Sequence, residues 1–230
     1  LEPKDIEKQE LSDTYYYYTK FGSPLAYVAP LEILSEQNFT ITKDTKIVDF
    51  GFGTIGHLAL WQKMGANVSG IEVDPILKVL YEKFLNSMNL VYGMFPYDSE
   101  LVHQLGGQYD LFISKNTLKK GFINPENGLK KSIDLKVSDA SFLDSVYNML
   151  KPGGFMLIYN LHRSFTEDYK PWKDGRSPYT IQQYKDAGFK VLKFNGDHTE
   201  FAKIMGEKLG WDENLDVEKD LFATYTLLQK

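Results

Sequence analysis

The sequence predicts an α/β domain built around a mainly parallel sheet. Short apolar segments that read as strands alternate with segments whose apolar residues recur at helical spacing. Residues 110–114 are mostly apolar, as expected for a strand that is covered on both faces. This alternation implies βαβ units with right-handed crossovers. The chain of 230 residues is expected to fold as one compact domain, with the α/β unit over 46–230 and a helical or lid segment over 1–45.

The expected elements follow one another in a regular order. Strands are predicted from short apolar runs at 46–50, 67–73, 90–92, 110–114, 155–160, 189–194 and 222–228. Helices are predicted from apolar spacing and from end signals at 24–35, 55–64, 75–89, 99–105, 139–150, 181–187 and 199–209. Pro75 suits the first turn of its helix, and the turn Lys151–Gly154 ends the helix before it. The stretches 119–136 and 163–179 carry neither pattern and are expected to be irregular.

The composition excludes several functions. Because the chain has no cysteine, it contains no disulfide, no Cys-based zinc site and no Cys nucleophile. The formal charge of −5 argues against a general nucleic-acid binder, which needs a basic face. The apolar run at 155–159 is far shorter than the ~20 residues that span a bilayer. We therefore expect no nucleic-acid, membrane or metal partner and a cytoplasmic location, with a leader removed before Leu1 left open.

A glycine-rich turn follows the first predicted strand and precedes a helix. Its glycines are Gly51, Gly53 and Gly56, and the helical pattern begins directly after them. A strand that ends in such a turn lets the backbone approach a bound nucleotide closely. Glu72 follows about 20 residues later at the end of the second strand, where an acid accepts hydrogen bonds from ribose hydroxyls. The pattern fits both a dinucleotide and S-adenosylmethionine.

Asp49 favours S-adenosylmethionine. A dinucleotide places its pyrophosphate at the helix N-terminus, and an acid two residues before the first glycine would repel it. S-adenosylmethionine instead carries an ammonium group and a sulfonium cation, which the same acid would attract. The alternative interpretation is that Asp49 only caps the turn at the end of its strand.

Five segments resemble, in the same order, the motifs of class I S-adenosylmethionine-dependent methyltransferases. They lie at 48–56, 68–74, 109–114, 149–155 and 183–191. The resemblance covers about residues 46–193 and the last strand. It implies a three-layer, Rossmann-like fold with a mostly parallel seven-stranded sheet whose last strand is antiparallel. It also implies S-adenosylmethionine as the cofactor.

The resemblance further implies a set of cofactor contacts. The glycines would pass the backbone beneath the cofactor, Asp49 would lie near its methionine end, and Glu72 would bind the ribose. Adenine contact is expected from Val73 and, on the other side, from Met94 or Phe95, or from Asp98. The full set of predicted cofactor-binding residues is Asp49, Gly51, Phe52, Gly53, Gly56, Glu72, Val73, Met94, Phe95 and Ser114.

Three residues after the fourth and fifth strands are the predicted catalytic groups. Lys115 is expected to bind an anionic acceptor, Asn116 to hold the cofactor or the acceptor, and His162 to act as a base. The alternatives are a solvated lysine, a turn asparagine and a structural histidine. Residues 114–116 also lack the Asn/Asp-Pro-Pro-Tyr pattern of enzymes that methylate amino groups of nucleic acids and glutamine. In the loop that follows, Arg176 is a candidate for carboxylate or phosphate recognition.

These features predict a methyltransferase that acts on an oxygen or nitrogen atom of a small-molecule acceptor. The acidic balance and the lack of an appended recognition domain favour a small acceptor over nucleic acid. Two other hypotheses stay open at this point. One is a protein that keeps the cofactor site without turnover, and the other is an NAD-dependent oxidoreductase.

Overall fold

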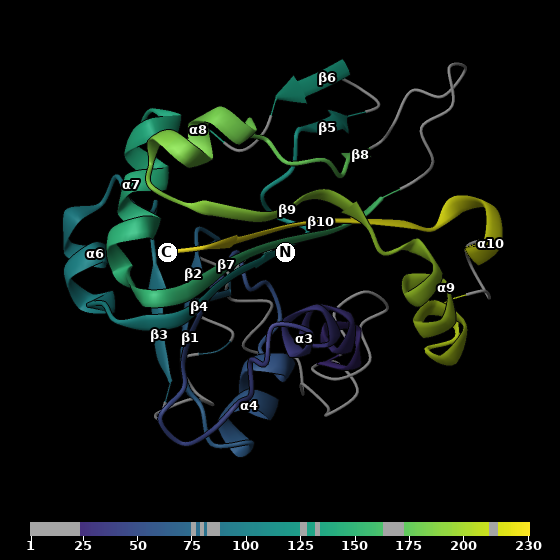
Figure 1. The fold of residues 1–230 in the computed structure, drawn as a ribbon, viewed down its shortest axis with the longest axis horizontal. Coiled ribbons are helices and arrows are strands. Elements are labelled where there is room, and N and C mark those ends of the chain that lie inside the picture. Colours follow the sequence, from purple (N-terminus) through teal and green to yellow (C-terminus); the bar gives the residue numbers. More distant parts are fainter. Residues whose placement is uncertain are drawn as a thin grey trace, which may run out of the picture.

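A seven-stranded sheet forms the centre of the protein, for which a computed structural model describes residues 24–74, 77–78, 81, 88–124, 128–131, 134–162, 173–211 and 216–230 (Figure 1). Its strands lie in the order β3-β2-β1-β4-β7-β10-β9. They are β1 Lys46–Phe50, β2 Asn67–Glu72, β3 Asn89–Tyr92, β4 Tyr109–Lys115, β7 Leu150–His162, β9 Lys190–Asp197 and β10 Phe222–Gln229. Neighbours from β3 to β7 are parallel, whereas β10 is antiparallel to β7 and β9. The predicted parallel sheet with an antiparallel last strand is confirmed.

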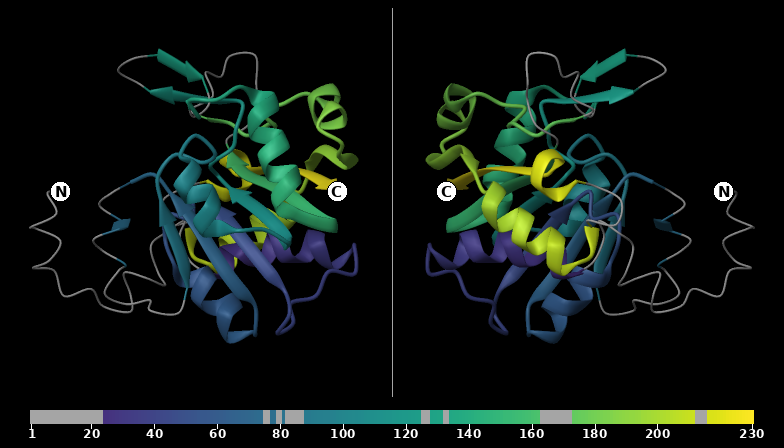
Figure 2. Two further views of the ribbon diagram at one scale, coloured as in Figure 1. Left: turned by 90° about the vertical axis from the view of Figure 1, so that its left-hand side faces the viewer. Right: turned by 90° about the vertical axis from the view of Figure 1, so that its right-hand side faces the viewer.

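Helices cover both faces of the sheet and complete three layers (Figures 1 and 2). One face carries η1 Pro24–Tyr27, α3 Val28–Ser35, α4 Gly56–Lys63 and α9 Thr199–Lys208, whose apolar side chains share one core cluster. The other face carries α6 Ser99–Leu105, α7 Asp139–Met149 and α8 Ile181–Asp186, which share a second cluster. The short helix α10 Val217–Asp220 packs beside α9.

The central strands supply side chains to both layers. In β4, Leu111 and Ile113 belong to the first core cluster, whereas Phe112 belongs to the second. In β7, Leu157 and Ile158 divide between the clusters in the same way. Because successive side chains of a strand point to opposite faces, a strand covered on both sides is apolar throughout. This explains why both strands could be predicted from uninterrupted apolar runs.

A second, three-stranded antiparallel sheet lies on the α7–α8 side of the molecule (Figure 1). It consists of β5 Gly121–Asn124, β6 Gly128–Lys131 and β8 Lys173–Asp174, in the order β6-β5-β8. These strands fall within the two stretches that were expected to be irregular, so that expectation is wrong there. Their sequences are rich in Gly, Asn and Lys, and Ile123 is the one β-branched residue among these three strands, although β-branched residues are typical of strands.

Other expectations differ from the structure at the ends of elements. Residues 151–154 belong to β7 and do not form a turn, because Gly153 donates its N–H to the Lys230 carbonyl at 3.0 Å and pairs the two chain segments there. Pro30 lies in the first turn of α3, where the missing N–H breaks no helical bond. Most of the predicted helix 75–89, residues 1–23 of the predicted lid segment and residues 163–172 lie outside the described residues.

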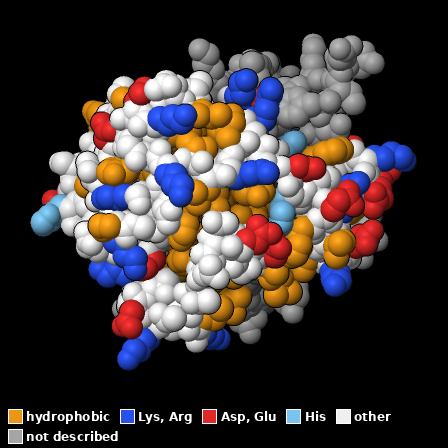
Figure 3. Space-filling model, viewed as in Figure 1, with side chains coloured by type: hydrophobic (Ala, Val, Ile, Leu, Met, Phe, Trp, Pro, Cys, Tyr) orange, Lys and Arg blue, Asp and Glu red, His pale blue; other side chains and the backbone are white. Residues whose placement is uncertain are grey.

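The surface agrees with the acidic composition. On the face shown in Figure 3, Lys and Arg side chains are spread among uncharged residues, and acidic side chains gather near α9 and α10. Among the described residues of this face, the basic side chains do not merge into one continuous surface. Within the described part of the chain, none of the helices combines the length and apolarity needed to cross a membrane.

Candidate functional site

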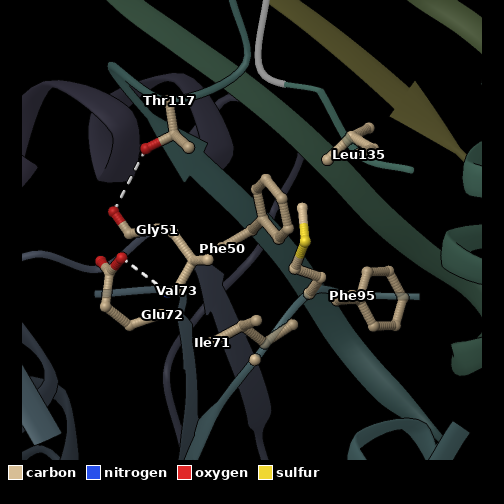
Figure 4. A pocket seen from close by; sticks show the side chains of 10 residues that line it. Phe50, Gly51, Ile71, Glu72, Val73, Phe95, Thr117 and Leu135 are labelled. Carbon is tan, nitrogen blue, oxygen red and sulfur yellow. Dashed lines mark hydrogen bonds between the residues drawn. The ribbon is translucent and has the colours of Figure 1, made fainter. Parts of the chain in front are cut away.

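A hollow of about 390 Å³ opens at the carboxyl ends of β1, β2, β3 and β4 (Figure 4). In open α/β sheets this edge is where ligands bind. Five predicted cofactor-binding residues line the hollow together: Gly51, Glu72, Val73, Met94 and Phe95. The other lining residues are Phe50, Ile71, Gly93, Thr117 and Leu135. The structure thus brings residues from four separate segments of the chain to one place.

The glycine turn is held from the β4 side by Thr117. Gly51 adopts φ +73° and Gly53 φ +59°, a region that side chains rarely occupy. The Thr117 hydroxyl donates to the Gly51 carbonyl at 3.2 Å, and a Cβ on Gly51 would lie 2.5 Å from Thr117 Cγ2. Gly51 therefore requires glycine both for its backbone and for its neighbour. Thr117 carries no signal in the sequence that could have identified it.

Glu72 connects the end of β2 to the glycine turn. Its Oε2 accepts the Gly53 N–H at 3.0 Å, and its Oε1 accepts the N–H groups of Val73 at 2.7 Å and Asp74 at 3.2 Å. Three backbone donors thus fix the carboxylate at the hollow (Figure 4). Val73 follows with a side chain that is 57% exposed at the rim, where a flat apolar ligand could pack on it.

The wall opposite Val73 is built from the loop after β3. The Met94 N–H donates to Asp98 Oδ2 at 2.6 Å, and Phe95 is buried among Phe50 and Phe112. Met94 and Phe95 line the hollow, whereas Asp98 holds the loop that carries them. Of the three residues predicted to contact the adenine on this side, Met94 and Phe95 therefore lie at the cavity wall and Asp98 does not.

Asp49 lies in a buried cluster with two aromatic partners. Its Oδ2 accepts a hydrogen bond from the Tyr27 hydroxyl at 3.1 Å and lies 2.5 Å from His57 Nε2. The Tyr27 and His57 rings stack at 3.7 Å, and Trp61 meets both rings edge-on. Burial lowers the pKa of His57, although Asp49 favours its protonated form, and burial beside Asp49 raises the pKa of Tyr27 well above its ordinary value.

The remaining predicted cofactor-binding residues Phe52, Gly56 and Ser114 do not line the hollow. Phe52 is buried and packs on Tyr92, and Gly70 in β2 makes room for its ring, since a Cβ there would lie 2.6 Å from Phe52 Cδ1. Gly56 is the first residue of α4. The buried Ser114 Oγ accepts the Leu118 N–H at 3.1 Å and is not among the residues that line the hollow.

The predicted catalytic residues Lys115 and Asn116 lie at the carboxyl end of β4, where Lys115 is buried and Asn116 is partly buried. Lys115 is 6% exposed, and its Nζ lies 5.0 Å from the centroid of the Tyr27 ring. Asn116 adopts φ +62°, and its Oδ1 accepts the Leu161 N–H at 2.8 Å. Asn116 thereby joins the end of β4 to β7. Roles for either residue in catalysis stay predictions.

His162 and Arg176 both have partners within the chain. His162 Nε2 lies 2.7 Å from Thr224 Oγ1, and its ring packs so closely on Gly175 that a Cβ there would lie 2.7 Å from His162 Cγ. The Arg176 guanidinium forms a bidentate pair with Asp174, with Nη2 2.7 Å from Oδ2. The predicted roles of base and of anion recognition stay untested for these two side chains.

A second hollow of about 460 Å³ adjoins the first and shares Thr117 and Leu135 with it. Its other lining residues are Leu118, Asp134, Val137, Asp139, Pro178 and Tyr179. It lies between the loop after β4 and the segments that lead into α7 and α8. The two hollows form adjacent spaces at one edge of the sheet. Sequence reasoning missed this second space, because half of its lining residues come from the two stretches expected to be irregular.

The described residues contain no group of three His, Asp or Glu side chains close enough together to hold a metal ion. The buried acid Asp49, the rim acid Glu72 and the buried cation of Lys115 are the charged groups next to the glycine turn.

Comparisons with known proteins identify the fold. No protein-family model and no curated protein matches the sequence. The structure is similar to phosphoethanolamine N-methyltransferase 2 of Haemonchus contortus, solved with phosphomonomethylethanolamine and S-adenosylhomocysteine, at a TM-score of 0.54 and 14% identity over 100% of this chain and 61% of that one. It thus spans less than two thirds of that enzyme.

Two further neighbours show how broadly this fold is used. An S-adenosylmethionine-dependent methyltransferase from Mesorhizobium loti matches at a TM-score of 0.53 and 13% identity, over 90% of this chain and 100% of that one. The [4+2]-cyclase SpnF matches at 0.52 and 12%, over 88% and 80%. The predicted Rossmann-like class I methyltransferase fold is confirmed. Because one fold supports different reactions, activity has to be argued from the site.

Proposed function

We propose that the protein is an S-adenosylmethionine-dependent methyltransferase that acts on an oxygen or nitrogen atom of a small molecule. The observation that carries this proposal is the convergence of the glycine turn, Glu72 and an apolar wall on one hollow in this fold.

The lining residues fit the parts of the cofactor. Val73 and Met94 offer apolar surface on two sides for the adenine, and Gly51 lets the backbone pass close to the ligand. Glu72 already accepts three backbone N–H groups, but its two carboxylate oxygens provide about four acceptor sites. It can therefore accept a ribose hydroxyl while it keeps the turn in place.

The charge beside the turn favours this cofactor over a dinucleotide. Asp49 is fully buried, and both donors to its Oδ2 come from this chain. A buried carboxylate acts strongly on nearby charges, because few water molecules screen it. It would oppose a pyrophosphate at the start of α4 and favour a ligand that carries positive charge.

The second hollow is the proposed place of the acceptor. It adjoins the first hollow through Thr117 and Leu135. The cofactor supplies a methyl group that is already activated by the sulfonium. The protein then has to align the acceptor and exclude water, and an oxygen or nitrogen acceptor often requires a base. His162 stays the predicted base and Lys115 the predicted acceptor-binding residue, and neither lines the second hollow.

A cofactor-binding protein without turnover is the second candidate. It is favoured by the bonds of Asn116 to Leu161 and of Arg176 to Asp174, which occupy two side chains that an enzyme could use. Binding and turnover therefore need separate measurements.

Thermal shift with S-adenosylhomocysteine and NADH, followed by transfer from methyl-labelled S-adenosylmethionine to small-molecule pools, tests the proposal. We expect stabilisation by S-adenosylhomocysteine alone and label in a small product. Stabilisation by NADH alone would support an oxidoreductase. Strong cofactor binding without transfer to any pool would support the protein without turnover.

A further inference from the structure

Three elements meet at the carboxylate of Asp49, directly before the glycine turn. Tyr27 comes from η1, Asp49 from β1 and His57 from the first turn of α4. The contacts of Asp49 with Tyr27 and His57 both go to one oxygen, Oδ2. The other oxygen, Oδ1, and His57 Nδ1 are buried and have no hydrogen-bond partner within the described part of the chain.

The titratable groups that face Asp49 come from η1, α4 and β4. Tyr27 from η1 has a pKa raised by burial and by Asp49, so it stays protonated and donates. His57 from α4 has a pKa lowered by burial and by Lys115, so it is neutral at pH 7 and carries its proton on the nitrogen that faces Asp49. Lys115 from β4 lies beyond the Tyr27 ring. Two neutral donors thus orient the carboxylate without neutralising it.

The element that carries Tyr27 is anchored at a second point. The helix α3 follows η1 directly, and its Glu32 Oε2 lies 2.9 Å from His198 Nε2, at the N-terminus of α9. The His198 ring stacks on Phe201 and meets Tyr159 of β7 edge-on. η1 and α3 are therefore bound to β1 through Tyr27 and to the start of α9, on the same face of the sheet, through Glu32.

We propose that Tyr27 is a positioning residue of the cofactor site. Together with His57 it holds Asp49 as an oriented negative charge beneath the glycine turn, so that cofactor affinity depends on the docking of η1. This inference rests on the proposed function, because the ligand that senses the charge is the cationic cofactor. It assigns to η1 a part in cofactor binding that the sequence of η1 does not indicate.

The proposal predicts a specific effect of Tyr27→Phe. This variant keeps the ring that stacks on His57 and removes the hydroxyl that donates to Asp49. With one donor lost, the carboxylate keeps only the contact to His57 and is held less firmly in its orientation. We expect S-adenosylhomocysteine to bind about tenfold more weakly at pH 7, the size of a lost hydrogen bond to a charged group.

Calorimetric titration with S-adenosylhomocysteine across about pH 5.5 to 8.5 tests this expectation, in a range that spans the ordinary histidine pKa. Tyr27→Phe should bind more weakly at every pH in the range, because the carboxylate keeps only its contact to His57, whereas a purely structural role of the ring, which this variant keeps, would leave the affinity unchanged. Asp49→Asn should be weak at every pH in the range. Tyr109→Phe is the matched control, since Tyr109 is also buried and its hydroxyl lies 2.8 Å from the Leu105 carbonyl, at the opposite end of β4.

The outcomes separate this inference from the proposed function. If the wild type binds S-adenosylhomocysteine and Tyr27→Phe binds it equally well at every pH, the role of Tyr27 is overturned and the proposed function stands. If the wild type does not bind it, both are overturned. If Tyr27→Phe does not fold, Asp49→Asn decides the matter, and wild-type affinity in that variant overturns the inference.

Discussion

Gly51→Ala tests how the glycine turn is confined. Gly53→Ala is its control, because it separates the cost of the backbone conformation from the cost of crowding by Thr117. Both glycines adopt positive φ, +73° for Gly51 and +59° for Gly53. A β-carbon in this region costs about 1–2 kcal/mol. At Gly53 nothing lies within 4 Å of a built Cβ, so this backbone term is the whole expected cost.

At Gly51 a second cost is added. A Cβ would lie 2.5 Å from Thr117 Cγ2 and 2.9 Å from Thr117 Cβ, so the Thr117 side chain or the turn has to move. Overpacking of this kind costs about 1–3 kcal/mol. We therefore expect Gly51→Ala to lower the free energy of unfolding by about 2–5 kcal/mol and Gly53→Ala by about 1–2 kcal/mol.

Urea denaturation of the wild type and both variants measures this difference. Equal slopes of the free energy of unfolding against urea concentration would show that the unfolded states are comparable. The double variant Gly51→Ala/Thr117→Ala should recover part of the loss, because the crowding atoms of Thr117 are gone. Equal destabilisation by the two glycine substitutions, or no recovery in the double variant, would show that Thr117 does not confine the turn.

Three further outcomes follow from the same geometry. Glu72→Ala should weaken S-adenosylhomocysteine binding at least about tenfold in calorimetry, because it removes the ribose acceptor and the bond to Gly53, while an unchanged Kd would place the ribose elsewhere. Asp98→Ala should reduce the free energy of S-adenosylhomocysteine binding more than the free energy of unfolding, since Asp98 holds the Met94 loop at the hollow. Equal losses in the two free energies would contradict this. The free energy of unfolding should fall as pH drops below about 6.5, because the lowered pKa of His57 means that the unfolded chain binds the proton more tightly. His57→Gln should flatten that part of the pH profile, and an unchanged profile would assign the dependence to another group.

The fold was largely predictable because local patterns determine it. The apolar runs at β4 and β7 follow from burial on both faces, and the positive φ of Gly51 and Gly53 requires glycine at the turn. Glu72 could be placed because its distance from the first glycine reflects one βαβ unit. The second sheet was missed, since its strands are short and rich in glycine, asparagine and lysine.

The surroundings of the site could not be predicted in the same way. Tyr27 contacts Asp49, which lies 22 positions away along the chain, and Thr117 contacts Gly51, which lies 66 positions away. Both contacts arise from tertiary packing, and these separations follow no repeat or motif. Asn116 illustrates the opposite problem. Its position after β4 suggested catalysis, whereas its bond to Leu161 depends on the register between β4 and β7.

A structure of the protein with bound S-adenosylhomocysteine would settle where the cofactor lies. We expect the adenine between Val73 and Met94, a ribose hydroxyl within hydrogen-bond distance of Glu72, and the methionine end beside the glycine turn at Gly51. A ligand bound elsewhere, or a hollow that stays empty at saturating ligand, would contradict the assignment of this edge of the sheet as the cofactor site.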